Sequence, residues 1–183
     1  MKKDEKMHYP SIRFAGFTDA WEQRKFGEVV QRESISAISG AGLPCVEYED
    51  IITEDGILNK DIFSKTAEKK GILFEGTEVL YGKLRPYLHN WLKPQFKGVA
   101  VGDWWVLQSD ILQQNFLYRL IQTKQFDEIA NQSAGSKMPR ADWGLVSNAM
   151  FNIPSNQEEQ EKIGAFFEYL DNIITLHQRQ DNC

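Results

Sequence analysis

Two short polar windows of this sequence carry the residue types best suited to hold an anion or the edge of a base. Arginine and lysine donate hydrogen bonds to phosphate oxygens and to the acceptors of guanine, and a hydroxyl group can donate to either. Aromatic side chains are interleaved with the cations of the first window, and a serine precedes those of the second. The candidate contact residues of the two windows are Tyr81, Lys83, Arg85, Ser136, Lys137 and Arg140.

The distribution of charge separates these windows from the rest of an acidic chain. The formal net charge is −5 over 183 residues, whereas a protein that coats nucleic acid without regard to sequence is usually basic. Residues 79–102 and 129–141 nevertheless contain no aspartate or glutamate. We therefore predict that Lys83, Arg85, Lys137 and Arg140 form one positive face on an acidic protein. The plainer interpretation of the first window is that Lys93 and Lys97 are solvated and that Tyr87 and Trp91 are buried.

The sequence offers little for catalysis. The three histidines, His8, His89 and His177, are far apart, and none has a neighbour at the spacing of metal ligands. There is no Gly-x-Ser-x-Gly nucleophile elbow, no Walker loop, no dinucleotide-binding fingerprint and no Asn-Pro-Pro-Tyr motif of adenine methyltransferases. We expect no catalytic residue, no metal and no cofactor. A serine, histidine and aspartate that meet only in space stay open, because such residues occur in any order along a chain.

A mixed set of strands and helices must position the two windows. Apolar residues recur with a period near two over residues 99–107, which predicts a strand. Residues 113–129 carry an apolar stripe at helical spacing and predict one helix. Residues 145–146 and 150–153 predict a closing strand or two short extended pieces. No regular βαβ alternation appears, so the predicted fold class is α+β.

The N-terminal part of the chain reads as a lead-in followed by an anchor. Residues 1–10 are polar and end in a proline, which predicts a poorly ordered segment. Phe14, Phe17 and Trp21 are expected to fix the following residues in the core. No window approaches the ~20 uninterrupted apolar residues that span a membrane, and no apolar run follows the N-terminal lysines as it would in a signal peptide. We expect a cytoplasmic protein.

Residues 156–180 predict a long helix with an apolar seam. Ser155 and Glu158 form the sequence pattern of a capping box. A row of side chains then recurs at spacings of three and four, as in a coiled coil: Ile163, Phe166, Phe167, Leu170, Ile173, Ile174 and His177. Two interpretations stay open: the seam meets a partner helix, or the helix packs on its own domain. On the first interpretation, removing residues 156–183 would leave a folded, monomeric domain.

Three segments, taken in order, resemble the specificity subunit of type I restriction-modification enzymes. The first runs from Ile12 to Lys25, and the second is Tyr81-Gly82-Lys83-Leu84-Arg85-Pro86-Tyr87-Leu88. The third is Gly135-Ser136-Lys137-Met138-Pro139-Arg140-Ala141-Asp142-Trp143, followed by Phe151-Asn152-Ile153-Pro154 and the helical pattern. No single segment is specific; the ordered set, which spans nearly the whole chain, carries the resemblance.

The resemblance implies a fold, a function and a set of partners. Such a subunit usually carries two target recognition domains, each followed by a long helix, and each domain reads one half of a split DNA site. The chain looks like one half: a lead-in at 1–10, a mixed target recognition domain of twisted, mostly antiparallel strands at 11–154, and a truncated spacer or dimerisation helix at 155–183. The implied partners are double-stranded DNA, the modification (methyltransferase) and restriction subunits and a second copy of the chain, with no membrane and no catalysis.

The sequence leaves two other functions open. In one, the chain is an interaction protein that docks a partner through its C-terminal helix and never touches DNA. In the other, it is a stand-alone hydrolase. Salt-dependent binding to duplex DNA distinguishes the recognition domain from both.

Overall fold

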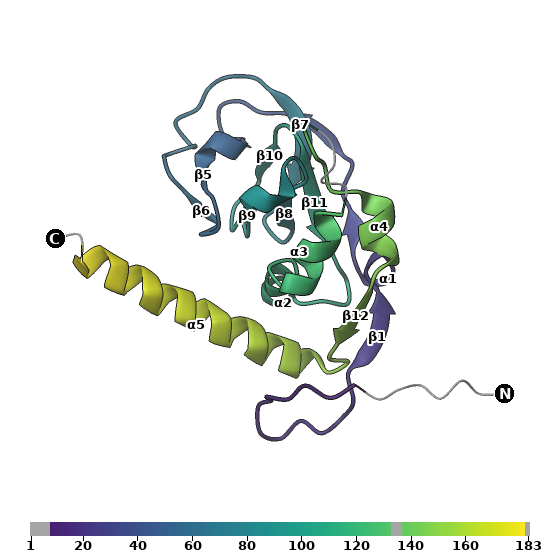
Figure 1. Ribbon diagram of the computed structural model, residues 1–183. Coiled ribbons are helices and arrows are strands. Elements are labelled where there is room, and N and C mark those ends of the chain that lie inside the picture. The colour runs from purple at the N-terminus through teal and green to yellow at the C-terminus, as the bar shows by residue number, and fades with distance from the viewer. Residues whose placement is uncertain (1–7, 133–136, 182–183) are drawn as a thin grey trace.

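The central layer of the structure is a four-stranded antiparallel sheet with the strand order β2-β11-β8-β9. The computed structural model describes residues 8–132 and 137–181 (Figure 1). The strands of the central sheet are β2 (Gln31–Arg32), β8 (Val79–Gly82), β9 (Trp91–Leu92) and β11 (Trp104–Gln108).

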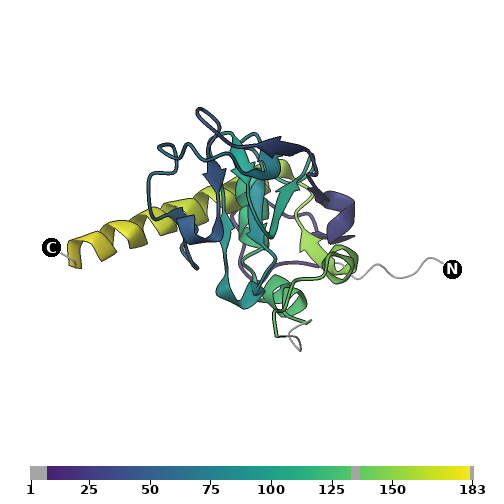
Figure 2. The same ribbon diagram turned by 90° about the horizontal axis from the view of Figure 1, so that it is seen from above.

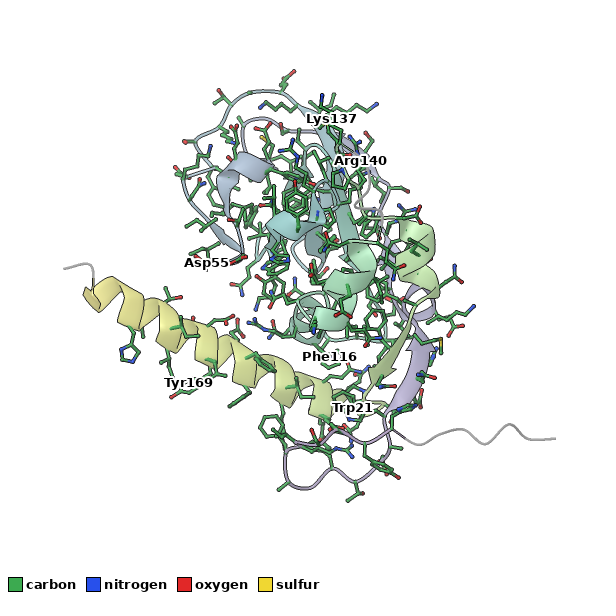
Figure 3. All side chains as sticks on the ribbon, in the orientation of Figure 1. Trp21, Asp55, Phe116, Lys137, Arg140 and Tyr169 are labelled. Atoms are coloured by element: carbon green, nitrogen blue, oxygen red, sulfur yellow. The ribbon has the colours of Figure 1, made fainter. Side chains whose placement is uncertain are left out.

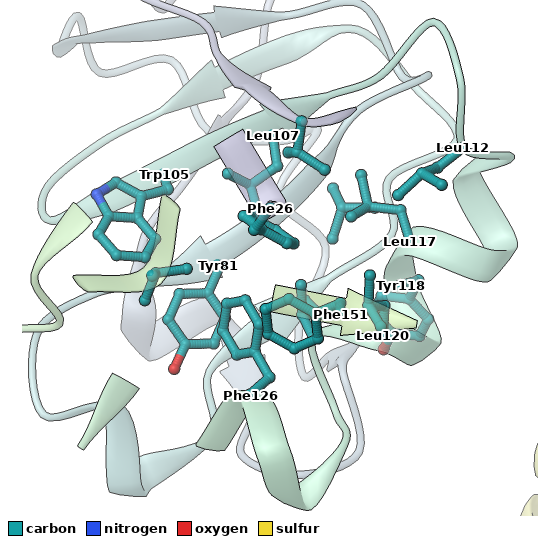
Figure 4. Close-up of a cluster of buried hydrophobic side chains, with 14 of the residues drawn as sticks. Phe26, Tyr81, Trp105, Leu107, Leu112, Leu117, Tyr118, Leu120, Phe126 and Phe151 are labelled. Carbon is teal, nitrogen blue, oxygen red and sulfur yellow. The ribbon is translucent and has the colours of Figure 1, made fainter. Parts of the chain in front are cut away.

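Both faces of this sheet are buried, which explains why its two long strands read as unbroken apolar runs. Successive residues of a strand point to opposite faces. Tyr81 and Trp105 therefore face the helices, where they join a large core cluster (Figure 4). Leu80 and Val106 face the other way and join a second cluster. Continuous apolar strands are the pattern expected of a sheet that is covered on both sides.

A second four-stranded sheet, of order β3-β7-β10-β4, covers one of these faces. It consists of β3 (Ser36–Ile38), β4 (Cys45–Val46), β7 (Lys70–Phe74) and β10 (Gly98–Ala100). Only the pairing of β10 with β4 is parallel among the strands in the described part of the chain. The mostly antiparallel α+β fold is therefore confirmed. Smaller elements complete the strands: the pair β5 (Ile51–Ile52) and β6 (Ile57–Leu58), and the 3-10 helices η1 (Tyr48–Asp50) and η2 (Pro86–Leu88).

Four short helices cover the other face of the central sheet. They are α1 (Phe26–Val29), α2 (Gln114–Leu120), α3 (Lys124–Ala130) and α4 (Trp143–Asn148). Beside them, β1 (Glu22–Lys25) pairs antiparallel with β12 (Met150–Ile153), so the two ends of the domain meet. His8 also forms a bridge with Trp21. Residues 1–7 of the predicted lead-in lie outside the described residues.

Three sequence predictions about single elements were wrong, each for a local reason. The strand predicted at 99–107 is two strands in different sheets, because Gly102 turns the chain with a φ of 104°. The helix predicted at 113–129 is two helices, because Thr123 accepts a hydrogen bond from Phe126 N and caps a new helix. Residues 145–146 lie in helix α4, which Asp142 caps by accepting from Leu145 N at 3.0 Å.

The long C-terminal helix α5 (Gln157–Asp181) is confirmed as an element, but its cap is a different residue from the one predicted. Asn156, and not Ser155, accepts at the helix N-terminus, from Glu158 N at 2.8 Å and Glu159 N at 3.4 Å. Both views show the helix running beyond the body of the domain (Figures 1 and 2).

The first half of α5 packs on its own domain. Glu159 is 1% exposed and accepts from Arg13 Nε at 2.6 Å and Nη2 at 2.7 Å. Gly164 allows the helix to approach α2 closely, because a Cβ there would lie 2.5 Å from the Cβ of Asn115. Lys93 Nζ then meets Glu168 Oε1 at 2.7 Å. Two ion pairs and a close approach at Gly164 thus hold the first half of α5 against the domain.

Candidate nucleic-acid interface

The two polar windows of the sequence lie side by side in the structure. Residues 83–85 follow β8 and run antiparallel to residues 139–141. Two main-chain hydrogen bonds of 2.8 Å join them: Ala141 N to Lys83 O and Arg85 N to Pro139 O. Main-chain pairing therefore brings together cations that lie more than fifty positions apart in the sequence.

Asp103 lies between two of these cations. It follows the turn at Gly102, and its carboxylate accepts from Arg140 Nη2 at 3.1 Å and from Arg140 Nε at 3.4 Å. Lys83 Nζ lies 3.6 Å from the same carboxylate. The hydrogen bond from Arg140 is the largest cause that holds the pKa of Asp103 below its ordinary value, although partial burial opposes it. We call Lys83 and Arg140, with the carboxylate of Asp103 between them, the cation cluster.

Tyr48 fixes the main chain beneath this cluster. Its hydroxyl donates to the carbonyl oxygen of Asp103 at 2.5 Å and accepts from Leu84 N at 3.1 Å. Its ring meets that of Trp104 edge to face, with the centroids 4.6 Å apart. Burial raises the pKa of this phenol, so the hydroxyl stays protonated and able to donate. The segment that carries Lys83 and Arg85 and the turn at Asp103 are therefore held to each other.

The remaining predicted contact residues fall in different places. Arg85 and Lys137 are exposed, and Lys137 and Arg140 lie at the end of the domain remote from α5 (Figure 3). Ser136 lies outside the described residues. Tyr81 is 1% exposed and packs between Trp105 and Phe126 (Figure 4). The prediction that Tyr81 contacts DNA is therefore wrong for this structure, because the side chain belongs to the core.

A groove of about 700 Å³ extends from Lys83 and contains a cation that the sequence did not single out. Arg32, at the end of β2, lies with its guanidinium carbon 4.5 Å from the ring centroid of Trp143. Trp105 and Gly102 also line the groove. Arg32 was missed because an acidic residue follows it and no second cation lies near it in the sequence; only the pairing of β2 with β11 brings it here.

Other polar residues of the first window have structural partners. Lys93 is mostly buried and binds Glu168 of α5 and Asn115, the latter at 2.6 Å. Lys97 is exposed and pairs with Glu75 at 2.8 Å. Trp91 is buried, as the plainer interpretation had it, whereas Tyr87 is 50% exposed. Residues of the first window thus have two different roles: Lys83 belongs to the cation cluster, and Lys93 helps to hold α5 on the domain.

The predicted seam of α5 is divided in the same way. Ile163 packs against the core cluster, and Arg119 lies 5.6 Å over the ring of Phe167. Ile163 is thus partly buried against the domain, whereas Phe167 stays 42% exposed. A second row follows at spacings of four, three and four residues, which keeps its members on one face of the helix. We call this row the outer stripe: Phe166, Leu170, Ile173 and His177.

The outer stripe and its neighbours leave apolar side chains in solvent. Phe166 is 45% exposed although it meets Phe14 edge to face at 5.7 Å. Ile174 and Leu176 are 54% and 60% exposed. Tyr169 points away from the domain (Figure 3). Exposed apolar rows of this kind mark surfaces that other elements cover.

The described part of the chain shows neither a metal-binding cluster nor a membrane-spanning helix. Within residues 8–132 and 137–181, no three histidine, cysteine, aspartate or glutamate side chains are grouped so that they could hold a metal ion. No helix of that same part of the chain is long and apolar enough to cross a membrane.

Comparison with known proteins identifies the family of this chain. A family model described as the type I restriction modification DNA specificity domain matches residues 19–182. The chain belongs to this family. The match spans both polar windows, the cation cluster and the whole of α5, so the specificity domain includes its helix. A comparison with curated proteins found no match.

Two solved structures share the fold of this specificity domain. One, described as the structural basis underlying complex assembly and conformational transition of the type I R-M system, has a TM-score of 0.63 and 16% identity, over 88% of this chain and 45% of that one. The HsdS subunit from Thermoanaerobacter tengcongensis has a TM-score of 0.61 and 21% identity, over 94% of this chain and 46% of that one. This specificity domain therefore spans less than half the length of either structure.

Proposed function

We propose that this chain recognises a specific sequence in duplex DNA, as one target recognition domain of a type I specificity subunit, and that it performs no catalysis itself. The single observation that supports this best is the pairing of residues 83–85 with residues 139–141. That pairing joins the segment of Lys83 and Arg85 to the segment of Arg140, in a protein whose net charge is −5.

The proposed interface consists of five cations. Four come from the two windows and one from the groove beside them: Lys83, Arg85, Lys137, Arg140 and Arg32. Duplex DNA carries a dense row of phosphates, and neutralising them releases counterions, which supplies affinity without regard to sequence. Planar guanidinium groups add the geometry for guanine edges in the major groove. The groove by Lys83 extends this surface along the central sheet.

Salt dependence of duplex binding tests this function. With four phosphates neutralised, the association constant should fall by about 100-fold between 50 and 200 mM salt. Fluorescence anisotropy of a labelled duplex measures it. The related alternative, in which the chain only docks a protein partner, predicts no binding at either salt concentration.

We further propose that residues 11–154 read DNA and that residues 155–183 serve assembly through the outer stripe. The chain spans less than half of the two similar structures, so a second recognition domain would come from a longer subunit or from a second copy. Two copies related by a two-fold axis would read an inverted repeat. The modification and restriction subunits would then dock on the paired helices.

A further inference from the structure

The carboxylate of Asp103 lies in the proposed interface, but it does not increase the affinity of this surface for DNA. Asp103 lies inside a cluster of cations, yet a negative charge there repels every phosphate that the cations attract. Its side chain is 28% exposed, so it faces the same solvent as Lys83 and Arg140. A protein selected only to hold DNA would gain from losing this charge.

The position of Asp103 is fixed more firmly than that of a chance surface acid. Its carbonyl oxygen accepts from the Tyr48 hydroxyl at 2.5 Å and from Lys83 N at 2.9 Å. Its carboxylate meets the guanidinium of Arg140 through both oxygens. A carboxylate has about four lone-pair sites, so both oxygens keep capacity to accept from a ligand.

The pair of Arg140 and Asp103 presents donors beside acceptors. In the major groove, a G·C pair presents the complement: the N7 and O6 acceptors of guanine beside the N4 amino donor of cytosine. Arginine is the commonest partner of the guanine N7 and O6 acceptors, and a carboxylate can accept from the cytosine N4 amino group. An A·T pair presents a different order: adenine has one acceptor, N7, next to its N6 amino donor, so it lacks the two adjacent acceptors that a bidentate guanidinium needs.

We propose that Asp103 is a specificity-determining residue, which together with Arg140 reads one G·C pair of the target. The inference rests on the proposed function, since it assumes that this face meets the major groove. In it, Asp103 gives up affinity for DNA in general, accepts from the cytosine amino group, and turns the guanidinium of Arg140 toward the guanine edge.

The test is selection of binding sites from a pool of duplexes with a randomised stretch, followed by sequencing of the bound fraction. The full chain should enrich a motif that contains at least one G·C pair. Asp103→Asn should bind the unselected pool more tightly, because a repulsive charge is gone. It should also lose at least about fivefold of the preference at one G·C position and shift that position toward A·T, because asparagine pairs with adenine.

Two control variants accompany the selection. Glu75→Gln removes the same charge from another ion pair, at the opposite end of the β7 and β10 pairing from Asp103; it should leave the motif unchanged. Asp103→Glu keeps the charge and should retain the preference. If Asp103→Asn enriches the same motif with the same strength as the unaltered chain, the inference is wrong and the proposed function stands. If the unaltered chain enriches no motif at all, the proposed function fails and the inference fails with it.

Discussion

At the level of single residues, Tyr81 has a role in the core and not in DNA contact. Its ring lies between Trp105 and Phe126 and is 1% exposed. We therefore expect Tyr81→Phe to leave the affinity for duplex DNA unchanged, whereas Arg85→Met should cost about 1 kcal/mol or more of binding free energy. Anisotropy titrations of the two variants at one salt concentration make the comparison. If Tyr81→Phe lost affinity for DNA at unchanged thermal stability, the Tyr81 hydroxyl would have to contact DNA, and this prediction would be wrong.

The ion pair at Asp103 predicts a dependence of stability on pH. Arg140 holds the pKa of this carboxyl below its unfolded value of about 4. The pair therefore stabilises the folded protein above that pH, and this stabilisation is lost as the pH falls toward the lowered folded pKa. Asp103→Asn should be less stable than the unaltered chain at neutral pH, and the difference should shrink in acid. Urea unfolding at the two pH values measures it; a difference independent of pH would contradict the assignment.

The candidate site was only partly predictable from the sequence, for reasons that particular residues make clear. The absence of acids around Lys83 and Arg140 indicated a shared face, and the structure brings these two together at one carboxylate. Asp103 escaped notice because it marks the end of an acid-free window, and only the turn at Gly102 folds it back onto the cations. Arg32 has no local signal at all. Partners that meet through sheet pairing leave no trace in the spacing of residues.

At the scale of the element, the start of α5 provides a matched pair of variants. Asn156 accepts from two helix N–H groups, whereas no such bond is seen for Ser155. Asn156→Ala should therefore cost about 1 kcal/mol of unfolding free energy, and Ser155→Ala almost nothing. Chemical denaturation of both variants gives the values. The reverse order would mean that the capping-box pattern in the sequence identified the cap correctly.

The elements themselves show where sequence patterns suffice and where they fail. Apolar periodicity found α5, and it found the apolar stretches that became α2, α3 and β11. It did not find the breaks at Gly102 and Thr123, because both segments stay apolar on either side of the break. It also merged the domain face and the outer stripe of α5 into one seam. Apolar periodicity in a sequence indicates that a side chain is buried, but it does not indicate which element covers that side chain.

At the level of the whole molecule, α5 packs on its own domain, so self-association through α5 cannot be tested by deleting the helix. Removing residues 156–183 would expose the core beneath Gln160 and Ile163 and leave Arg13 without its partner Glu159, so the truncated domain is no longer expected to stay intact. A point substitution on the outer stripe is the better probe. We expect Ile173→Glu to abolish self-association while leaving the fold unchanged.

Sedimentation of the full chain at tens of micromolar measures this. Ala165→Glu is the matched control, because it adds the same charge to an exposed position on another side of the same helix. The control should associate as the unaltered chain does. An unaltered chain that sediments as a monomer under these conditions would contradict self-association through the outer stripe, and leave a partner helix on another chain as the assembly route to examine.

The proposed function requires that one face of the domain, built from both polar windows, binds duplex DNA. Its most direct test compares Lys137→Met/Arg140→Met with Lys97→Met/Lys124→Met, which removes the same total charge from exposed lysines elsewhere. Duplex binding is measured by anisotropy across a range of salt concentrations. We predict that the first double variant loses affinity by roughly tenfold or more and lowers the salt slope by about 1, for the lost phosphate contact of Lys137, while the second changes neither appreciably. Equal losses in the two double variants would contradict a DNA-binding face at Lys137 and Arg140, because they would show that only the total charge of the protein affects its affinity for DNA.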